Sequence, residues 1–135
     1  MVKRVVFDTN VLISAYLWKG SARKALEMIR TGDFTLLVSK DTVNELIHVL
    51  AYDKFGLTPQ EIQPIVRDLM NISEFVEVKS EVQAIKADPT DDIFLALAID
   101  GNADAIVSGD HHLLDLKEFE EIPIMTIRRF LSVSS

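Results

Sequence analysis

Apolar residues follow two alternating patterns along this chain. Short β-branched or apolar runs predict buried strands, and longer segments with apolar residues every three or four positions predict helices. The predicted strands are residues 2–7, 34–38, 74–78, 103–107 and 122–125. The predicted helices are residues 10–31 with a break near Gly20, 39–53, 58–71, 91–100, 112–116 and 126–131. This alternation favours an α/β fold in which a mostly parallel sheet carries helices on both faces.

Residues at the expected helix ends support these boundaries. Ser39 is placed to cap the helix that follows the second strand. Thr58, with Glu61 three residues later, has the pattern of a capping box. Thr90 is expected to cap the apolar helix that comes after it. Pro123 has no backbone N–H to donate, which predicts that the last strand lies at an edge of the sheet.

The bulk properties narrow the class of protein. A length of 135 residues suits a single domain spanning residues 1–135. The chain has no cysteine, which excludes disulfides and thiolate metal sites and favours a cytoplasmic protein. No apolar run approaches the ~20 residues of a membrane helix, so no membrane association is expected. The net charge of −7 argues against a protein that coats nucleic acid, although clustered carboxylates in a metal site would contribute to it.

Four acidic residues fall where a predicted strand ends or a predicted helix begins. Asp8 and Asp110 follow strands, Glu45 lies early in the helix after the second strand, and Asp92 opens an apolar helix. The C-terminal ends of parallel strands meet at one edge of a sheet, so these carboxylates are expected to lie together there. Their mutual repulsion favours a hard cation such as Mg²⁺ or Mn²⁺, and hydrolysis of a phosphodiester is the chemistry that we expect.

Each of these positions also has a simpler structural interpretation. Asp8 can cap the following helix, Glu45 can be a solvated helix residue, and Asp110 can be a turn residue. Asp91 and Asp92 both benefit from the positive end of the helix dipole. We favour Asp92 as the ligand because the apolar run begins directly after it, and Asp91 stays a possible ligand in its place.

Four sequence blocks carry a more specific signal. They are residues 5–12 (VVFDTNVL), Ser39 with Val43 and Glu45, residues 88–98 (DPTDDIFLALA), and residues 103–110 (ADAIVSGD). In this order they resemble the PIN-domain family, and in particular its VapC-like toxins of toxin–antitoxin pairs. The resemblance runs over essentially the whole chain.

The resemblance implies a three-layer α/β/α sandwich with a central, mostly parallel sheet of about five strands. It also implies a metal-dependent endoribonuclease that uses one or two Mg²⁺ or Mn²⁺ ions. The catalytic, metal-binding acids of the family correspond by position to Asp8, Glu45, Asp92 and Asp110. Asn10 and Ser108 would be polar supports for these acids. The choice of RNA over DNA, and a cognate antitoxin as partner, rest on the resemblance alone.

Contacts with substrate or partners are less marked in the sequence. Arg23 and Lys24 follow a flexible Lys-Gly-Ser stretch and are candidate phosphate contacts. The apolar residues between Leu12 and Trp18 exceed one helix face. They suit either core packing or a docking surface for a partner chain or a second copy, as in a homodimer or higher oligomer.

Other classes of protein share some of these features. A haloacid-dehalogenase-type phosphatase needs an Asp where Asn10 stands, and a phospho-receiver domain needs an acidic pair near the first strand and a Lys near the last. A metal-dependent DNA nuclease of related fold and a non-catalytic PIN-like binding protein stay open as alternatives. His111 and His112 follow Asp110 directly, but a carboxylate-based mechanism needs neither.

Overall fold

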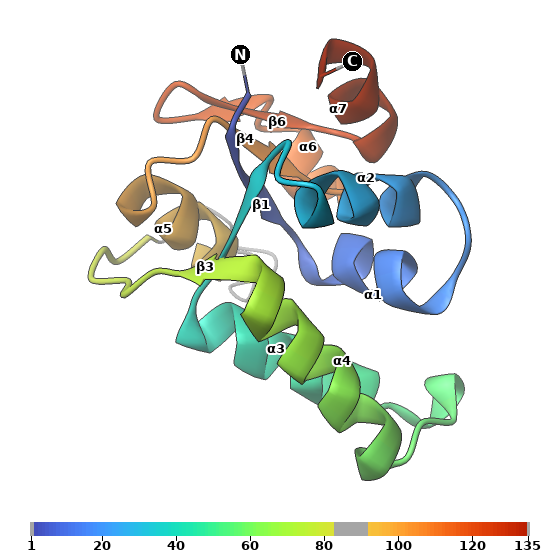
Figure 1. The fold of residues 1–135 in the computed structure, drawn as a ribbon. Helices are drawn as coiled ribbons and strands as arrows, with labels where there is room; N and C mark the ends of the chain where they lie inside the picture. Colours follow the sequence, from blue (N-terminus) through green and yellow to red (C-terminus); the bar gives the residue numbers. More distant parts are fainter. Residues whose placement is uncertain (1, 83–91, 135) are drawn as a thin grey trace.

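The computed structural model describes residues 2–82 and 92–134, and strands alternate with helices along them (Figure 1). The strands are β1 (Arg4–Phe7), β2 (Thr35–Val38), β3 (Ser73–Phe75), β4 (Ala105–Val107), β5 (Glu118–Phe119) and β6 (Ile122–Met125). The helices are α1 (Thr9–Leu17), α2 (Ser21–Arg30), α3 (Lys40–Leu50), the 3₁₀ helix η1 (Asp53–Phe55), α4 (Pro59–Ile72), α5 (Asp92–Asp100), α6 (His111–Leu114) and α7 (Ile127–Ser134). Within the described residues, none of these helices is both long and apolar enough to span a membrane.

The strands of the described residues form one six-stranded sheet in the order β3-β2-β1-β4-β6-β5. β1 pairs in parallel with β2 and β4, β2 with β3, and β4 with β6. Among these described strands, only the two-residue β5 runs antiparallel, beside β6. The strand order reverses between β1 and β4, and open α/β sheets bind ligands at the C-terminal ends of the strands at such a reversal.

Helices cover both faces of the sheet, which confirms the three-layer α/β/α prediction. Val5 and Phe7 of β1 face α1, α2, α3, α4 and α7, whereas Val6 faces α5 and α6. In Figure 1, α5 lies on one side of β1 and α1 and α2 on the other. Both faces of β1 are buried, which explains why its residues 5–7 are an unbroken apolar run and do not alternate with polar residues.

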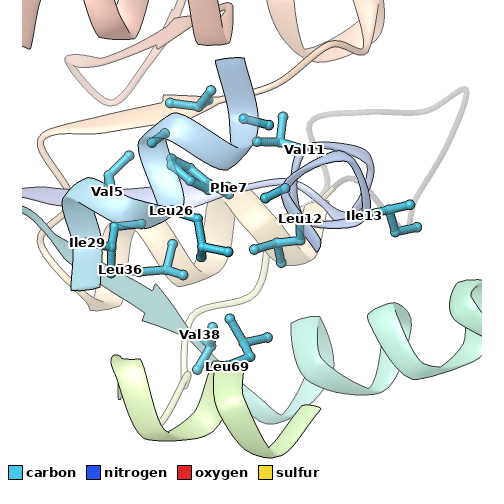
Figure 2. Close-up of a cluster of buried hydrophobic side chains, with 14 of the residues drawn as sticks. Val5, Phe7, Val11, Leu12, Ile13, Leu26, Ile29, Leu36, Val38 and Leu69 are labelled. Carbon is cyan, nitrogen blue, oxygen red and sulfur yellow. The ribbon is translucent and has the colours of Figure 1, made fainter. Parts of the chain in front are cut away.

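The larger core cluster fixes the helices that surround the candidate site. Side chains of β1 and β2 meet side chains of α1, α2 and α4 (Figure 2), and the labelled ones include Phe7, Leu36, Leu12, Leu26 and Leu69. Phe130 of α7 closes the cluster, with its ring centroid 5.9 Å from that of Phe7. This packing holds α1 against the C-terminal end of β1.

The predicted caps at two helix starts are confirmed. Ser39 Oγ accepts from the backbone N–H of Thr42 at 3.2 Å, and a capping box is present there. Thr58 Oγ1 accepts from the Glu61 N–H at 3.3 Å, and Glu61 Oε1 accepts from the Thr58 N–H at 3.0 Å. The break at Gly20 is also confirmed, since its φ of 150° lies in a region that favours glycine.

The structure differs from the sequence prediction at the last strand. Pro123 does not mark an edge, because β6 lies between β4 and β5. Its partner in the short antiparallel pair is Glu118. The sequence around residues 118–119 carries no apolar alternation of strand length, so β5 was not expected. The predicted Thr90 cap lies outside the described residues.

Candidate metal-binding site

The candidate site lies at the reversal of strand order between β1 and β4. Asp8 follows β1 directly, and Ser108, Gly109 and Asp110 follow β4. Val6 pairs with Ile106 and Phe7 with Val107, and the Asp8 N–H donates to the Val107 carbonyl oxygen at 3.0 Å. This register brings together side chains that are separated by about a hundred positions in the chain.

Asp8 is buried, with only 4% of its surface exposed. Its Oδ1 accepts from the Val11 N–H at 2.9 Å, which caps α1. Its Oδ2 accepts a short hydrogen bond from the hydroxyl of Ser108. The alternative prediction that Asp8 caps α1 is therefore confirmed, and the cap fixes the carboxylate at the edge of the sheet.

The pKa of Asp8 is raised above its ordinary value. Burial is the largest cause, because removal from water penalises the charged carboxylate. Hydrogen bonds from Ser108 and from the backbone of Val11 and Gly109 oppose this shift, whereas the nearby charge of Asp110 adds to it. In the described part of the chain, no lysine or arginine forms an ion pair with Asp8 or Asp110. The charged form of Asp8 is thus left without a cationic partner from these residues.

Ser108 links the carboxylate of Asp8, which follows β1, to the backbone of Asp110, which follows β4. Its hydroxyl donates to Asp8 and accepts from the Asp110 N–H at 2.9 Å. Asp110 caps α6, since its Oδ1 accepts from the His112 N–H at 2.8 Å. The His112 ring nitrogen Nδ1 lies 3.4 Å from the same oxygen. Ser108 therefore holds the Asp8 side chain and the Asp110 backbone in one hydrogen-bonded arrangement.

The other two predicted acids lie on the helices around this edge. Asp92 is the first residue of α5 and is 9% exposed, and α5 packs against β1 and β4. Glu45 is half-buried on α3, which packs against α1 and α5. Within residues 2–82 and 92–134, no three His, Asp or Glu side chains gather closely enough to hold a metal ion. The structure therefore pairs Asp8 with Asp110, and the complete quartet stays a prediction; Asp91 lies outside the described residues.

The predicted polar and basic contacts have different surroundings. Ser108 contacts Asp8 as expected, but among the described residues no hydrogen bond joins Asn10 to Asp8. Asn10 is exposed and instead lines a small pocket of about 200 Å³ beside Ser108 and Gly109. Arg23 donates to the carbonyl oxygens of Ala15 and Tyr16 at the end of α1, at 3.4 and 3.2 Å.

Lys24 is exposed, so it is free to meet a phosphate, whereas the contacts of Arg23 serve the α1–α2 connection. Two further polar residues at this edge had no site role in the sequence prediction. Thr126 lines the same pocket as Asn10 and accepts from the Arg129 N–H at 3.2 Å, as expected of a helix cap. Thr9 is buried, and within the described residues its Oγ1 has no hydrogen-bond partner. The sequence signal for both was their place within two residues of a strand end.

Comparisons with known proteins bear on the family and the fold of this chain. A family model described as PIN domain matches residues 4–112. Curated proteins give no match. The fold is similar to a crystal structure of VapBC2 from Rickettsia felis bound to a DNA fragment from their promoter, with a TM-score of 0.60 and 14% identity over 90% of this chain and 96% of that chain. PIN domains are generally nucleases that use divalent metal ions. Since the family model spans well over half of the 135 residues, the chain belongs to the PIN-domain family.

Proposed function

We propose that this protein is a Mg²⁺- or Mn²⁺-dependent endoribonuclease and the toxin of a toxin–antitoxin pair. One observation carries the proposal. The buried Asp8 carboxylate meets Ser108 and lies near Asp110 at the strand-order reversal, and no lysine or arginine of the described residues neutralises it. A buried carboxylate in this state is stabilised by a bound cation.

The residues present fit a hard divalent cation. Carboxylate oxygens are among the donors that Mg²⁺ and Mn²⁺ prefer, and the chain has no cysteine to favour a softer metal. Asp8 and Asp110 would hold the ion, with Asp92 and Glu45 as the further acids of the predicted quartet. A bound ion supplies charge stabilisation to the phosphodiester and lowers the pKa of water.

The protein side chains do the positioning. Ser108 fixes Asp8 by donating to it, and α1 fixes the other carboxylate oxygen through the Val11 N–H. Both carboxylate oxygens of Asp8 are thus held in place before any ligand arrives. Such support of a ligating carboxylate by hydrogen bonds is typical of metal sites.

The choice of RNA as substrate rests on the resemblance found in the sequence, and a partner protein is supported by the likeness in fold. The similar structure contains VapBC2 with promoter DNA, which supports a partner protein for this chain as well. We infer that the partner is a cognate antitoxin, that the protein acts in the cytoplasm, and that it forms a homodimer or higher oligomer. A DNA nuclease of related fold and a non-catalytic binding protein are the alternatives that an experiment must separate.

The test is cleavage of mixed-sequence RNA and DNA pools with Mn²⁺, with Mg²⁺ and with EDTA. We expect RNA cleavage with metal only, and its loss in Asp8→Asn, which keeps the size of the side chain but removes its charge. Asp104→Asn is the matched control, because Asp104 accepts backbone hydrogen bonds at the opposite end of β1. Cleavage of DNA alone would favour the alternative nuclease. Equal cleavage by Asp8→Asn and wild type would reject the site.

A further inference from the structure

Trp18 stands exposed at the end of the helix that begins at the candidate site. α1 stops at this residue, whose N–H donates to the Ser14 carbonyl oxygen at 3.2 Å, and Gly20 then turns the chain towards α2. The extended backbone at Trp18 takes its side chain out of the buried face of α1, and 53% of the residue is exposed. It is the only tryptophan in the sequence.

Phe55 of η1 supports the Trp18 ring from a distant part of the sequence. The two ring centroids lie 6.1 Å apart with an interplanar angle of 57°. Phe55 is half-buried and packs against the larger core cluster, so the pair rests on a fixed base. Lys54 Nζ lies 5.1 Å from the centroid of the Phe55 ring, and Lys19 follows Trp18 directly.

We propose that Trp18 and Phe55, flanked by Lys19 and Lys54, form a stacking platform for unpaired bases of a single-stranded nucleic acid. This inference rests on the proposed function and extends it to how the substrate strand is held. Aromatic faces that stack bases, combined with cations that meet the backbone phosphates, are the usual means of binding single strands. We call this surface, made of Trp18, Phe55, Lys19 and Lys54, the aromatic platform.

Charge favours a nucleic acid over a protein as the occupant. The whole chain has a net charge of −7, yet the aromatic platform carries two lysines, with Asp53 as the acidic neighbour in η1. Lysine is depleted in the cores of protein–protein interfaces. Phe75 of β3 is also 53% exposed, but its neighbours Glu74 and Glu77 are acidic, so it lacks the complementarity to phosphate.

The position of the aromatic platform suits a strand that continues beyond the cut. α1 begins after Asp8 and ends at Trp18, and an α-helix rises 1.5 Å per residue, so the two ends are about 15 Å apart. A few nucleotides of unpaired strand can bridge such a distance. The same helix therefore connects the proposed cleavage site with the aromatic platform.

The first measurement uses the fluorescence of the single tryptophan. Full-length protein carrying Asp8→Asn, which prevents cleavage, is titrated with a short mixed-sequence single-stranded RNA. We expect saturable quenching of Trp18, and much weaker quenching by an abasic strand of the same length, which has phosphates but no bases. No quenching by the RNA, or equal quenching by the abasic strand, would overturn the aromatic platform.

The second measurement uses variants and the anisotropy of a labelled RNA. Trp18→Ala is expected to weaken binding roughly 5- to 100-fold, Trp18→Phe to restore most of it, and Phe75→Ala to bind as the parent does. Circular dichroism melting checks that each variant folds. Unchanged RNA binding by Trp18→Ala, together with a changed oligomeric state in light scattering, would make this face a protein interface and reject the proposal.

The two proposals fail in different ways. Metal-dependent RNA cleavage by the wild type, with no base-dependent quenching, would leave the proposed function in place and remove only the aromatic platform. Base-dependent quenching without any cleavage would leave a single-strand binding surface and reject the nuclease.

Discussion

The two ends of strand β1 gather acidic side chains in opposite ways. At the N-terminal end, Arg4 forms a two-pronged ion pair with Glu74, at 2.6 and 3.1 Å, and donates from Nε to the Gly101 carbonyl oxygen at 2.9 Å. Asp104 accepts from the backbone N–H groups of Lys3 and Arg4, both at 2.9 Å. At the C-terminal end, Asp8 is buried beside Ser108 and near Asp110. Within the described residues, no arginine or lysine forms an ion pair with it.

The pKa values of the carboxyl groups at the two ends shift in opposite directions. The hydrogen bond from Arg4 lowers the pKa of Glu74, whereas burial raises that of Asp8. At the N-terminal end the Glu74 carboxylate has a cationic partner in Arg4, and the pair stabilises the fold. At the C-terminal end, within the described residues, the Asp8 carboxylate has no lysine or arginine as a partner, and a bound cation could fill that place. The comparison separates acids that stabilise the fold from acids that are available for chemistry.

The largest effect expected from these contacts concerns Ser108. Ser108→Ala removes the hydroxyl that holds Asp8, and loss of such a supporting hydrogen bond reduces metal affinity or activity about 10- to 100-fold. Ser80→Ala is the matched control, since Ser80 Oγ donates at 2.5 Å to Asp100, the last residue of α5. Rates of metal-dependent cleavage by the two variants measure this, and equal rates would remove Ser108 from the site.

A smaller effect concerns stability without metal. The folded-state pKa of Asp8 is raised, so wild-type protein loses stability as pH rises from its unfolded value of about 3.8 through the folded pKa. Asp8→Asn has no carboxyl group to titrate at this position, so its stability lacks this dependence on pH. The free energy of unfolding of Asp8→Asn minus that of wild type should therefore grow as pH rises above 3.8, and it should level off once the pH has passed the folded-state pKa of Asp8.

Urea unfolding in EDTA at several pH values gives this difference directly. Any hydrogen bond that the Asn side chain forms poorly contributes a constant offset, so the slope with pH is the informative quantity. A difference that shrinks with rising pH would mean that Asp8 has a cationic partner in the folded protein.

The smallest effect, with the opposite sign, is expected at the other end of β1. The lowered pKa of Glu74 means that its pairing with Arg4 stabilises the fold above the unfolded pKa of 4.5 and that this contribution is lost as pH falls through the folded pKa. Both side chains are partly exposed, so Glu74→Gln should cost less than about 1 kcal/mol at pH 7. The same unfolding series measures it, and a cost that persists at pH 2 would show that packing rather than charge is lost.

Local chemistry predicted much of this molecule. The strand before Asp8, the caps at Ser39 and Thr58, and the break at Gly20 follow from apolar runs and from the hydrogen-bonding capacity of single residues. At Asp8 the predicted helix cap is confirmed through one carboxylate oxygen, while the other oxygen accepts from Ser108, and the role of Asp8 as a metal ligand stays a prediction.

Features that depend on tertiary contacts were not predictable in this way. Ile47 belongs to the apolar pattern of α3 but is 38% exposed and lines an apolar groove against α4, because the sheet-facing side of α3 is filled by Val43, Leu46 and Leu50. Most of the cluster between Leu12 and Trp18 is core, as one reading held, but Trp18 is exposed because α1 ends there. Spacing alone cannot show where a helix stops relative to its neighbours.

The central claim is that the C-terminal end of β1 binds a divalent cation through Asp8. Isothermal titration of Mn²⁺ into metal-free wild type, Asp8→Asn and Asp104→Asn tests it without any assumption about the substrate. We predict binding by the wild type, at least about 10-fold weaker binding by Asp8→Asn, and unchanged binding by Asp104→Asn. Equal affinities for wild type and Asp8→Asn, or no binding by the wild type, would contradict the account.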